Sequence, residues 1–168
     1  MKNNSYFFYC VLLFAFCIQV SCGIYSFTGV NTTVKTATVH LISNQASVVY
    51  PGLSGVLTEK LKNKIITNSP IAVVEQNGEM EFSGTITSYQ TSPVAASANE
   101  TAALNRLSVI INIECSNKND EKQSWTQNFS RYADFNSSQD LSSVEAQLIE
   151  EITDQLVDDI FNKALVNW

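Results

Sequence analysis

The stretch NRLSVIINIECSN, residues 105–117, decides the fold because its apolar and polar side chains alternate. Apolar residues occupy every second position: Leu107, Val109, Ile111, Ile113 and Cys115. Between them lie Ser108, Asn112 and Glu114, with Ile110 as the exception. A two-residue period is typical of a β-strand with one buried face and one polar face. The stretch therefore predicts a sheet that other elements cover on one face only.

Further strands are predicted on both sides of this stretch. A polar turn at residues 116–120 is followed by residues 123–132 (QSWTQNFSRY), which we expect to pair back as a strand. Upstream, residues 79–89 form another predicted strand, in which Gly84 indicates a bulge or a close backbone approach. The small and polar residues 91–101 (TSPVAASANET) are expected to form the loop between these two long strands.

Two shorter β-branched segments precede them. Residues 36–42 (TATVHLI) and residues 71–75 (IAVVE) each read as a strand, and a polar loop at residues 43–47 follows the first. Asn77-Gly78 predicts a hairpin turn between 71–75 and the next strand, because both residues accept a positive φ. Strands joined by short polar turns favour an antiparallel meander.

Two helices are predicted outside these strands. The first is expected to open at Pro51 and to end near Asn68, with a stripe formed by Leu53, Val56, Leu57, Leu61, Ile65 and Ile66. The second begins at a capping box, Ser142-x-x-Glu145. Its stripe consists of Leu141, Val144, Leu148, Ile152, Leu156, Ile160 and Leu165, with acidic residues mainly opposite. Such a helix must lie against an apolar surface, either the sheet or, as the alternative, a partner protein.

These elements predict an α+β fold. We expect two helices packed on one face of a mostly antiparallel four- to five-stranded sheet. A signal of 21 residues would leave 147 of the 168 residues, which is enough for one domain. The expected organisation is a signal peptide at 1–21 and a single domain at 22–168, in which 22–35 is an extended lead-in.

The first 21 residues have the pattern of a secretory signal. Lys2 precedes an apolar run from Tyr6 to Val20, which only Gln19 interrupts, and small residues follow. The run is short for a membrane span, which takes about 20 apolar residues. The segment Gln19-Val-Ser-Cys22 resembles the lipobox of bacterial lipoproteins. That resemblance implies cleavage before Cys22 and attachment of lipid to its thiol; ordinary cleavage that leaves an unmodified cysteine is the alternative.

Composition excludes several classes of function. The chain carries a formal charge of −6, which becomes −7 once Lys2 leaves with the signal, and this argues against nucleic-acid binding. Cys115 is the one cysteine that remains beside Cys22 after the signal is removed, and His40 is the only histidine. We find no phosphate-binding loop, metal-ligand spacing or nucleophile motif. The sequence therefore predicts a protein without enzymatic activity, metal or cofactor.

Five segments resemble the LptE family of lipopolysaccharide-assembly lipoproteins, in the form found in the Bacteroidetes. They are residues 22–29 (CGIYSFTG), 51–59 (PGLSGVLTE), 82–89 (FSGTITSY), 129–135 (FSRYADF) and 149–161 (IEEITDQLVDDIF). Together they extend over nearly the whole mature chain. The resemblance implies a small α+β lipoprotein that plugs the LptD β-barrel, helps to place lipopolysaccharide, and performs no covalent chemistry.

The resemblance also implies where the protein acts. It is expected at the periplasmic face of the outer membrane, held by lipid on Cys22, with an LptD-like barrel and lipopolysaccharide as partners. Lipopolysaccharide carries phosphates, so Arg106, Lys118, Lys122 and Arg131 are candidate contacts, with a solvated surface role as the alternative for each. A generic envelope lipoprotein that scaffolds another outer-membrane complex is the second hypothesis for the whole chain.

The lipid anchor gives a direct prediction. Mass spectrometry of the mature N-terminus is expected to find a peptide that begins at Cys22 and carries the mass of acyl chains. A Cys22→Ser variant should lose that mass and leave the membrane fraction, because each buried methylene contributes about 0.8 kcal/mol of membrane affinity. An unmodified Cys22 peptide from the wild-type chain would overturn the anchor.

Overall fold

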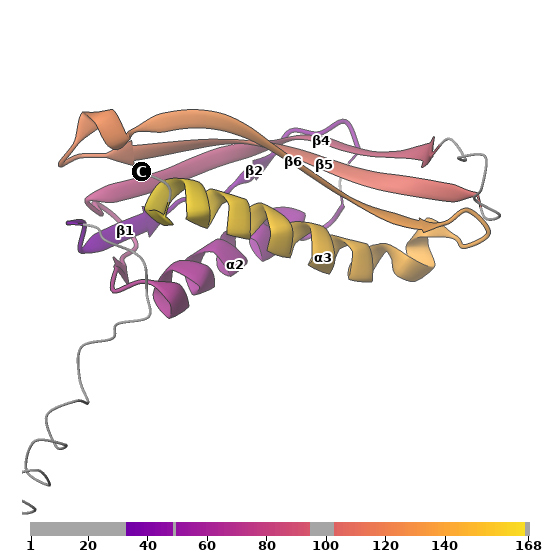
Figure 1. Ribbon diagram of the computed structural model, residues 1–168, viewed down its shortest axis with the longest axis horizontal. Helices are drawn as coiled ribbons and strands as arrows, with labels where there is room; N and C mark the ends of the chain where they lie inside the picture. Colours follow the sequence, from indigo (N-terminus) through magenta and orange to yellow (C-terminus); the bar gives the residue numbers. More distant parts are fainter. Residues whose placement is uncertain (1–32, 49, 95–102, 167–168) are drawn as a thin grey trace, which may run out of the picture.

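The computed structural model describes residues 33–48, 50–94 and 103–166 and places helices along one face of a long twisted sheet (Figure 1). The expected signal peptide, Cys22 and the lead-in as far as residue 32 lie outside the described residues. The elements are β1 (Thr36–Val39), β2 (Ser43–Asn44), α2 (Leu53–Asn68), β3 (Ala72–Val73), β4 (Met80–Val94), β5 (Leu104–Asn117), a 3₁₀ turn (Glu121–Gln123), β6 (Trp125–Asn136), α3 (Leu141–Phe161) and a π-helical segment (Asn162–Val166).

The sheet is mixed and has six strands, which corrects the expectation of a mostly antiparallel sheet of four to five. Its order is β3-β1-β4-β5-β6, and β2 pairs with β4 beyond the end of β1. The long strands β4, β5 and β6 are antiparallel, whereas β1, β2 and β3 pair in parallel with their neighbours. The parallel part arises because α2 carries the chain back to the start of β1, so that β3 must run in the same direction as β1.

Asn77-Gly78 does not join a hairpin, contrary to the expectation. β3 and β4 pair with opposite sides of β1, and the intervening segment crosses β1. The Gly78 N–H donates to Thr38 Oγ1 at 2.9 Å. A Cβ on Gly78 would lie 2.6 Å from the Thr38 backbone nitrogen. Gly78 is therefore required by a close crossing, while Asn77 supplies the positive φ of 59°.

Both helices cover the same face of the sheet, as predicted (Figure 1). The α2 stripe buries Leu53, Leu57, Leu61 and Ile65. Val56 and Ile66, which were expected in that stripe, are 36% and 57% exposed. The stripe of α3 is buried from Leu148 to Phe161 by α2 and the sheet. The core lies between the two helices and the apolar faces of the long strands.

The predicted capping box of α3 does not form. The helix begins at Leu141 with Asp140 as its N-cap, so Ser142 already lies inside the first turn. The carboxylate of Glu145 accepts a hydrogen bond from the Tyr89 hydroxyl instead of reaching back along its own helix. Leu141 packs against the core, which favours the earlier start. A tertiary contact has thus replaced a local one.

A bulge in β4 gives this tyrosine its position. The pairing of β4 with β5 shifts by one residue between Ile86 and Ser88, which leaves Thr87 as the extra residue. Ile86 and Tyr89 consequently both face the helices and are buried. Of the two alternatives expected at Gly84, a bulge or a close backbone approach, the structure shows the close approach, because Gly84 pairs in register with Ile113 and a Cβ there would lie 2.6 Å from the Asn112 carbonyl oxygen.

The long strands extend further than their sequence suggested. β4 continues through Val94, so the first residues of the loop expected at 91–101 are strand, and the rest of that loop lies outside the described residues. β5 begins at Leu104 and buries Leu107, Val109, Ile111 and Ile113 completely, as its alternation predicted. Cys115 is buried at the end of the same row.

The contact at Gly84 can be tested against a second glycine. A Cβ at Gly84 would lie 2.5 Å from Ile113 Cδ1 and 2.6 Å from the Asn112 carbonyl oxygen, whereas one at Gly55 in α2 meets nothing within 4 Å. We expect Gly84→Ala to lower the free energy of unfolding by about 1–3 kcal/mol. Gly55→Ala should raise it by about 0.5–1 kcal/mol through helix propensity. Urea unfolding measures both; a Gly84→Ala chain as stable as wild type would contradict the close approach.

Candidate interaction surface

The face of the sheet opposite the helices is the candidate interaction surface. Side chains of the long strands alternate, so every second residue points away from α2 and α3. We call the resulting surface the open face, because no described helix packs against it. Its residues are half-buried or exposed. They are Glu81, Ser83, Thr85, Ser88, Gln90 and Ser92 of β4, Arg106, Ser108, Ile110, Asn112 and Glu114 of β5, and Thr126, Asn128, Ser130, Tyr132 and Asp134 of β6.

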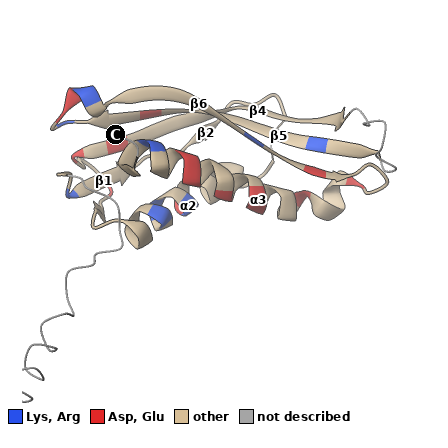
Figure 2. Cartoon of the chain, viewed as in Figure 1, with Lys and Arg blue, Asp and Glu red and all other residues tan. Residues whose placement is uncertain are grey.

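Neutral polar side chains dominate the middle of the open face. Asn112 and Asn128 are directly opposite each other, and the Asn112 Nδ2 donates to Asn128 Oδ1 at 2.7 Å. Toward β2, the hydroxyls of Ser43 and Thr85 are hydrogen-bonded at 3.2 Å. Charged residues lie mainly on the helices and toward the ends of the sheet, and the long strands are largely uncharged between them (Figure 2). A partner on this face would meet hydrogen-bonding groups more than charge.

Arg106 lies on the open face but its charge is compensated. It is opposite Asp134 in the register of β5 and β6. Its Nε and Nη2 donate to the two Asp134 carboxylate oxygens at 2.7 and 2.8 Å. The guanidinium also stacks 3.5 Å from the centroid of the Tyr132 ring. The hydrogen bond from Arg106 lowers the pKa of Asp134 and so keeps it ionised.

Lys118 and Lys122 lie together at the other end of β5. Lys118 Nζ is 2.6 Å from Glu81 Oε1, and this contact lowers the pKa of Glu81. His40 Nε2 is 3.6 Å from the other oxygen of Glu81, so this histidine lies at the sheet surface as expected. Lys122 is exposed in the 3₁₀ turn, and its side chain has no ion-pair partner among the described residues. Lys118 follows Arg106 by twelve positions in an extended segment, which corresponds to about 40 Å.

Arg131 lies on the opposite face, toward the helices. Its Nε and Nη2 donate to Asp159 of α3 at 2.6 Å each. This bidentate pair joins β6 to the end of α3. The structure therefore does not gather the four predicted basic residues into one site: Lys118 and Lys122 share one end, Arg106 lies at the other, and Arg131 stabilises the packing of α3.

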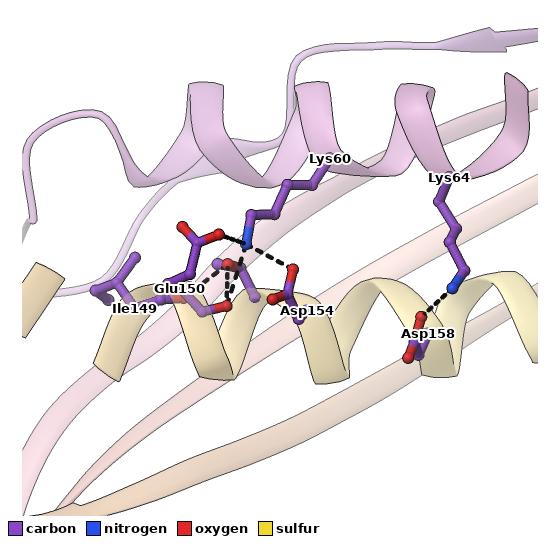
Figure 3. A network of polar contacts seen from close by, with 7 residues as sticks. Lys60, Lys64, Ile149, Glu150, Asp154 and Asp158 are labelled. Atoms are coloured by element: carbon purple, nitrogen blue, oxygen red, sulfur yellow. Dashed lines mark hydrogen bonds and ion pairs between the residues drawn. The ribbon is translucent and has the colours of Figure 1, made fainter. Parts of the chain in front are cut away.

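The sequence did not indicate an interhelical charge network; it placed the acidic residues of α3 mainly opposite the apolar stripe and suggested no partner for them. Lys60 of α2 is 3.1 Å from Glu150 Oε1 and 2.6 Å from Asp154 Oδ1, and Lys64 is 2.6 Å from Asp158 Oδ1 (Figure 3). The order of these contacts shows that α2 and α3 run in the same direction. The sequence does contain a matching spacing of four residues, between the lysines of one predicted helix and the acidic residues of the other. It does not show how the two helices are aligned with each other.

Groups with potential chemistry lie apart from one another. Burial raises the pKa of the Cys115 thiol to about 12, so it is not a thiolate at neutral pH. No group of three or more His, Cys, Asp or Glu in the described parts of the chain is arranged to hold a metal ion. Within the same residues, none of the helices combines the length and apolar character that crossing a membrane requires.

Comparison with known proteins identifies relatives of this fold. The LptE family, described as lipopolysaccharide-assembly, matches residues 34–164. Rare lipoprotein B from Shewanella oneidensis has 13% sequence identity and a TM-score of 0.53, over 76% of this chain and 92% of that one. A minor lipoprotein from Acinetobacter baumannii has 12% identity and a TM-score of 0.50, over 79% and 93%. Both likenesses concern the fold. No curated protein matches the sequence.

The ion pair between Arg106 and Asp134 predicts that the stability of the domain depends on pH. Arg106→Gln should raise the pKa of Asp134 toward its ordinary value of about 3.9. Because the folded-state pKa is lowered, the stability that the pair contributes is present at neutral pH and is lost as the pH falls through that pKa. NMR titration of the Asp134 carboxyl and urea unfolding at several pH values measure both effects. Lys122→Gln is the control; an Asp134 pKa that Arg106→Gln leaves unchanged would contradict the pairing.

Proposed function

The chain belongs to the LptE family of lipopolysaccharide-assembly proteins, and we propose that it partners an LptD-like outer-membrane β-barrel in placing lipopolysaccharide. The observation that carries this proposal is the extent of the family match, which runs from Val34 before β1 to Ala164 after α3 and so includes α2, α3 and each strand that the structure describes. The proposed role is one of binding and positioning, in agreement with a family that performs no covalent chemistry.

The open face supports a role inside or against a polar cavity. A domain inside a polar barrel must present hydrogen-bonding groups on its outer surface. An apolar outer surface would be exposed to water, and it would leave the polar groups of the barrel wall buried without hydrogen-bond partners. The neutral amides and hydroxyls at Asn112, Asn128 and Ser130 meet this requirement. The two helices, in contrast, use their apolar stripes within the domain, which supports the sheet rather than a helix as the surface for the partner.

The proposed position is the periplasmic side of the outer membrane, with lipid on Cys22 as the anchor. The expected lead-in at 22–35 is too long by two residues, because Val34 is buried in the core and the Lys35 N–H donates to Glu79 Oε2 at 2.6 Å. Eleven residues, 23–33, separate Cys22 from Val34. Such a segment extends at most about 40 Å. We propose that residues 22–33 serve as a tether between the lipid and the folded part of the domain, after removal of the signal peptide at 1–21.

Lipopolysaccharide contact is proposed at the end of the sheet that carries Lys118 and Lys122. Lys122 is the better candidate because its ammonium group has no ion pair in the described part of the chain, whereas Lys118 would have to leave Glu81. Arg106 and Arg131 are each engaged by a carboxylate at two oxygens. The net charge of −6 opposes strong general attraction to phosphates, so any contact would be local.

A scaffold for another envelope complex is the alternative function, and affinity purification from detergent-solubilised membranes discriminates between the two. Recovery of a large LptD-like barrel in stoichiometric amount supports the assembly role. Recovery of a different membrane complex without such a barrel supports the scaffold.

Depletion tests the function itself. When the protein is depleted, we expect the arrival of newly made lipopolysaccharide at the cell surface to slow, because the barrel would lack its partner. Surface labelling of lipopolysaccharide after pulse labelling measures the rate, and re-expression of the wild-type chain is the control. Arrival at the normal rate in depleted cells would refute the assembly role.

A further inference from the structure

β6 forms one edge of the sheet and pairs with β5 along its whole length. It contains twelve residues, Trp125–Asn136, and the pairing with β5 from Leu104 to Cys115 has no register shift. No other described strand pairs with its outer side. A regular strand of this length at an edge presents a row of backbone groups that another strand can use.

The alternation of hydrogen bonds between β5 and β6 shows which residues of β6 form that row. The Ser137 N–H donates to the Ala103 carbonyl at 3.0 Å, and these residues are opposite each other in continuation of the β5–β6 register. Opposed residues of an antiparallel ladder alternate between exchanging hydrogen bonds and turning their backbone groups outward. Odd-numbered residues of β6 therefore bond to β5. The even-numbered residues from 126 to 134 point N–H and C=O away from the sheet: Thr126, Asn128, Ser130, Tyr132 and Asp134. The carbonyl of the sixth, Asn136, accepts from the Gln139 N–H in the turn that follows.

Other edges of this sheet are protected, whereas β6 is not. β3 has only two residues, and the part of β4 beyond β2 contains Pro93, which has no N–H. β6 has no proline, no lysine and no bulge, which are the usual protections of an edge. Its charged residues, Arg131 and Asp134, are both held in internal ion pairs. Among these edges of the described sheet, β6 is therefore the one that lacks these protective features.

A groove beside β6 indicates the charge that a segment bound at this edge would carry. It has a volume of about 420 Å³, and it lies between residues 127–131 of β6 and Asp159, Asn162 and Lys163 at the end of α3. Arg131 and Asp159 neutralise each other. Lys163 is exposed and has no carboxylate within ion-pair distance in the described part of the chain. The groove therefore carries a positive charge on a chain whose formal charge is −6.

We propose that β6 accepts an extended strand of the partner barrel protein, which continues the sheet and places an acidic side chain beside Lys163. This inference rests on the proposed function, because it takes the barrel as the partner. Backbone hydrogen bonds to the even-numbered residues would supply affinity, and the groove would supply register and selectivity.

A crosslinking walk tests the strand pairing. A photoreactive phenylalanine analogue is placed singly at Thr126, Asn128 and Ser130 in the full-length chain, with exposed Glu59 of α2 as the control position. Paired strands keep a residue-for-residue register. We therefore expect the crosslinked residue in the co-purified barrel protein to move by two positions at each step. Crosslinks that stay at one loop, scatter, or join two copies of this chain would overturn the proposal.

A proline substitution tests the outward N–H. Ser130→Pro removes a donor that does not bond to β5, while Ser130→Ala truncates the same side chain and keeps the donor. We expect Ser130→Pro to reduce recovery of the barrel about tenfold relative to Ser130→Ala, through lost hydrogen bonds and a steric block. Both variants should unfold at similar temperatures. Equal recovery of the barrel with two folded variants would overturn the proposal.

Lys163→Glu provides a test that leaves the ladder of β6 intact. It reverses the charge beside the groove, and we expect it to reduce barrel recovery severalfold at low salt and less at high salt. An unchanged recovery at both salt concentrations would overturn the acidic assignment. Failure of strand addition is distinguishable from failure of the proposed function: in the first case the barrel co-purifies with every variant, and in the second it is absent even with the wild-type chain.

Discussion

Burial of one apolar face of the sheet is the constraint on which the rest of this structure depends. The row from Leu107 to Cys115 in β5 is removed from water only if both helices lie on the same side. α2 and α3 meet this requirement side by side and in the same direction, and Lys60 and Lys64 join them across their polar margin (Figure 3). With both helices committed to one face, the other face remains for contact with a partner.

The apolar face of the sheet is covered differently at the two ends of the domain. At the β1 end, the chain crosses the strand so closely that only glycine fits at position 78. At the far end, the bulge at Thr87 turns Tyr89 toward the helices, where its hydroxyl bonds to Glu145 and its ring stacks with Tyr50. The covered face therefore extends beyond the reach of α2, and α3 is attached to the sheet at both of its ends, by Glu145 and by Asp159.

Most charges around the open face are paired, which limits what electrostatics can do there. Arg106 with Asp134, and Lys118 with Glu81, leave a surface whose recognition depends on hydrogen bonds and shape. Glu114 of β5 is the charged residue of the open face that has no ion pair among the described residues. Within the same part of the chain, Lys122 in the β5–β6 connection and Lys163 after α3 are unpaired as well, beyond the ends of the long strands. A partner that contacts the sheet and the edge of β6 together would meet a mostly neutral polar face, with the negative charge of Glu114 and the positive charge of Lys163.

The sequence by itself determined the elements that have their own periodicity: the alternation of β5, the stripe of α3, and hence an α+β fold with helices on one face. It also pointed to the family, through short segments spread along the chain. Only the tertiary structure decided the direction of the short strands, the crossing at Asn77-Gly78 and the partners of Lys60, Arg131 and Glu145. The physical reason is that periodicity reports which side of an element is buried, which is a local property. Strand direction, register and ion pairing depend on which distant element is placed beside it, and a two-residue strand carries no pattern from which that neighbour can be inferred.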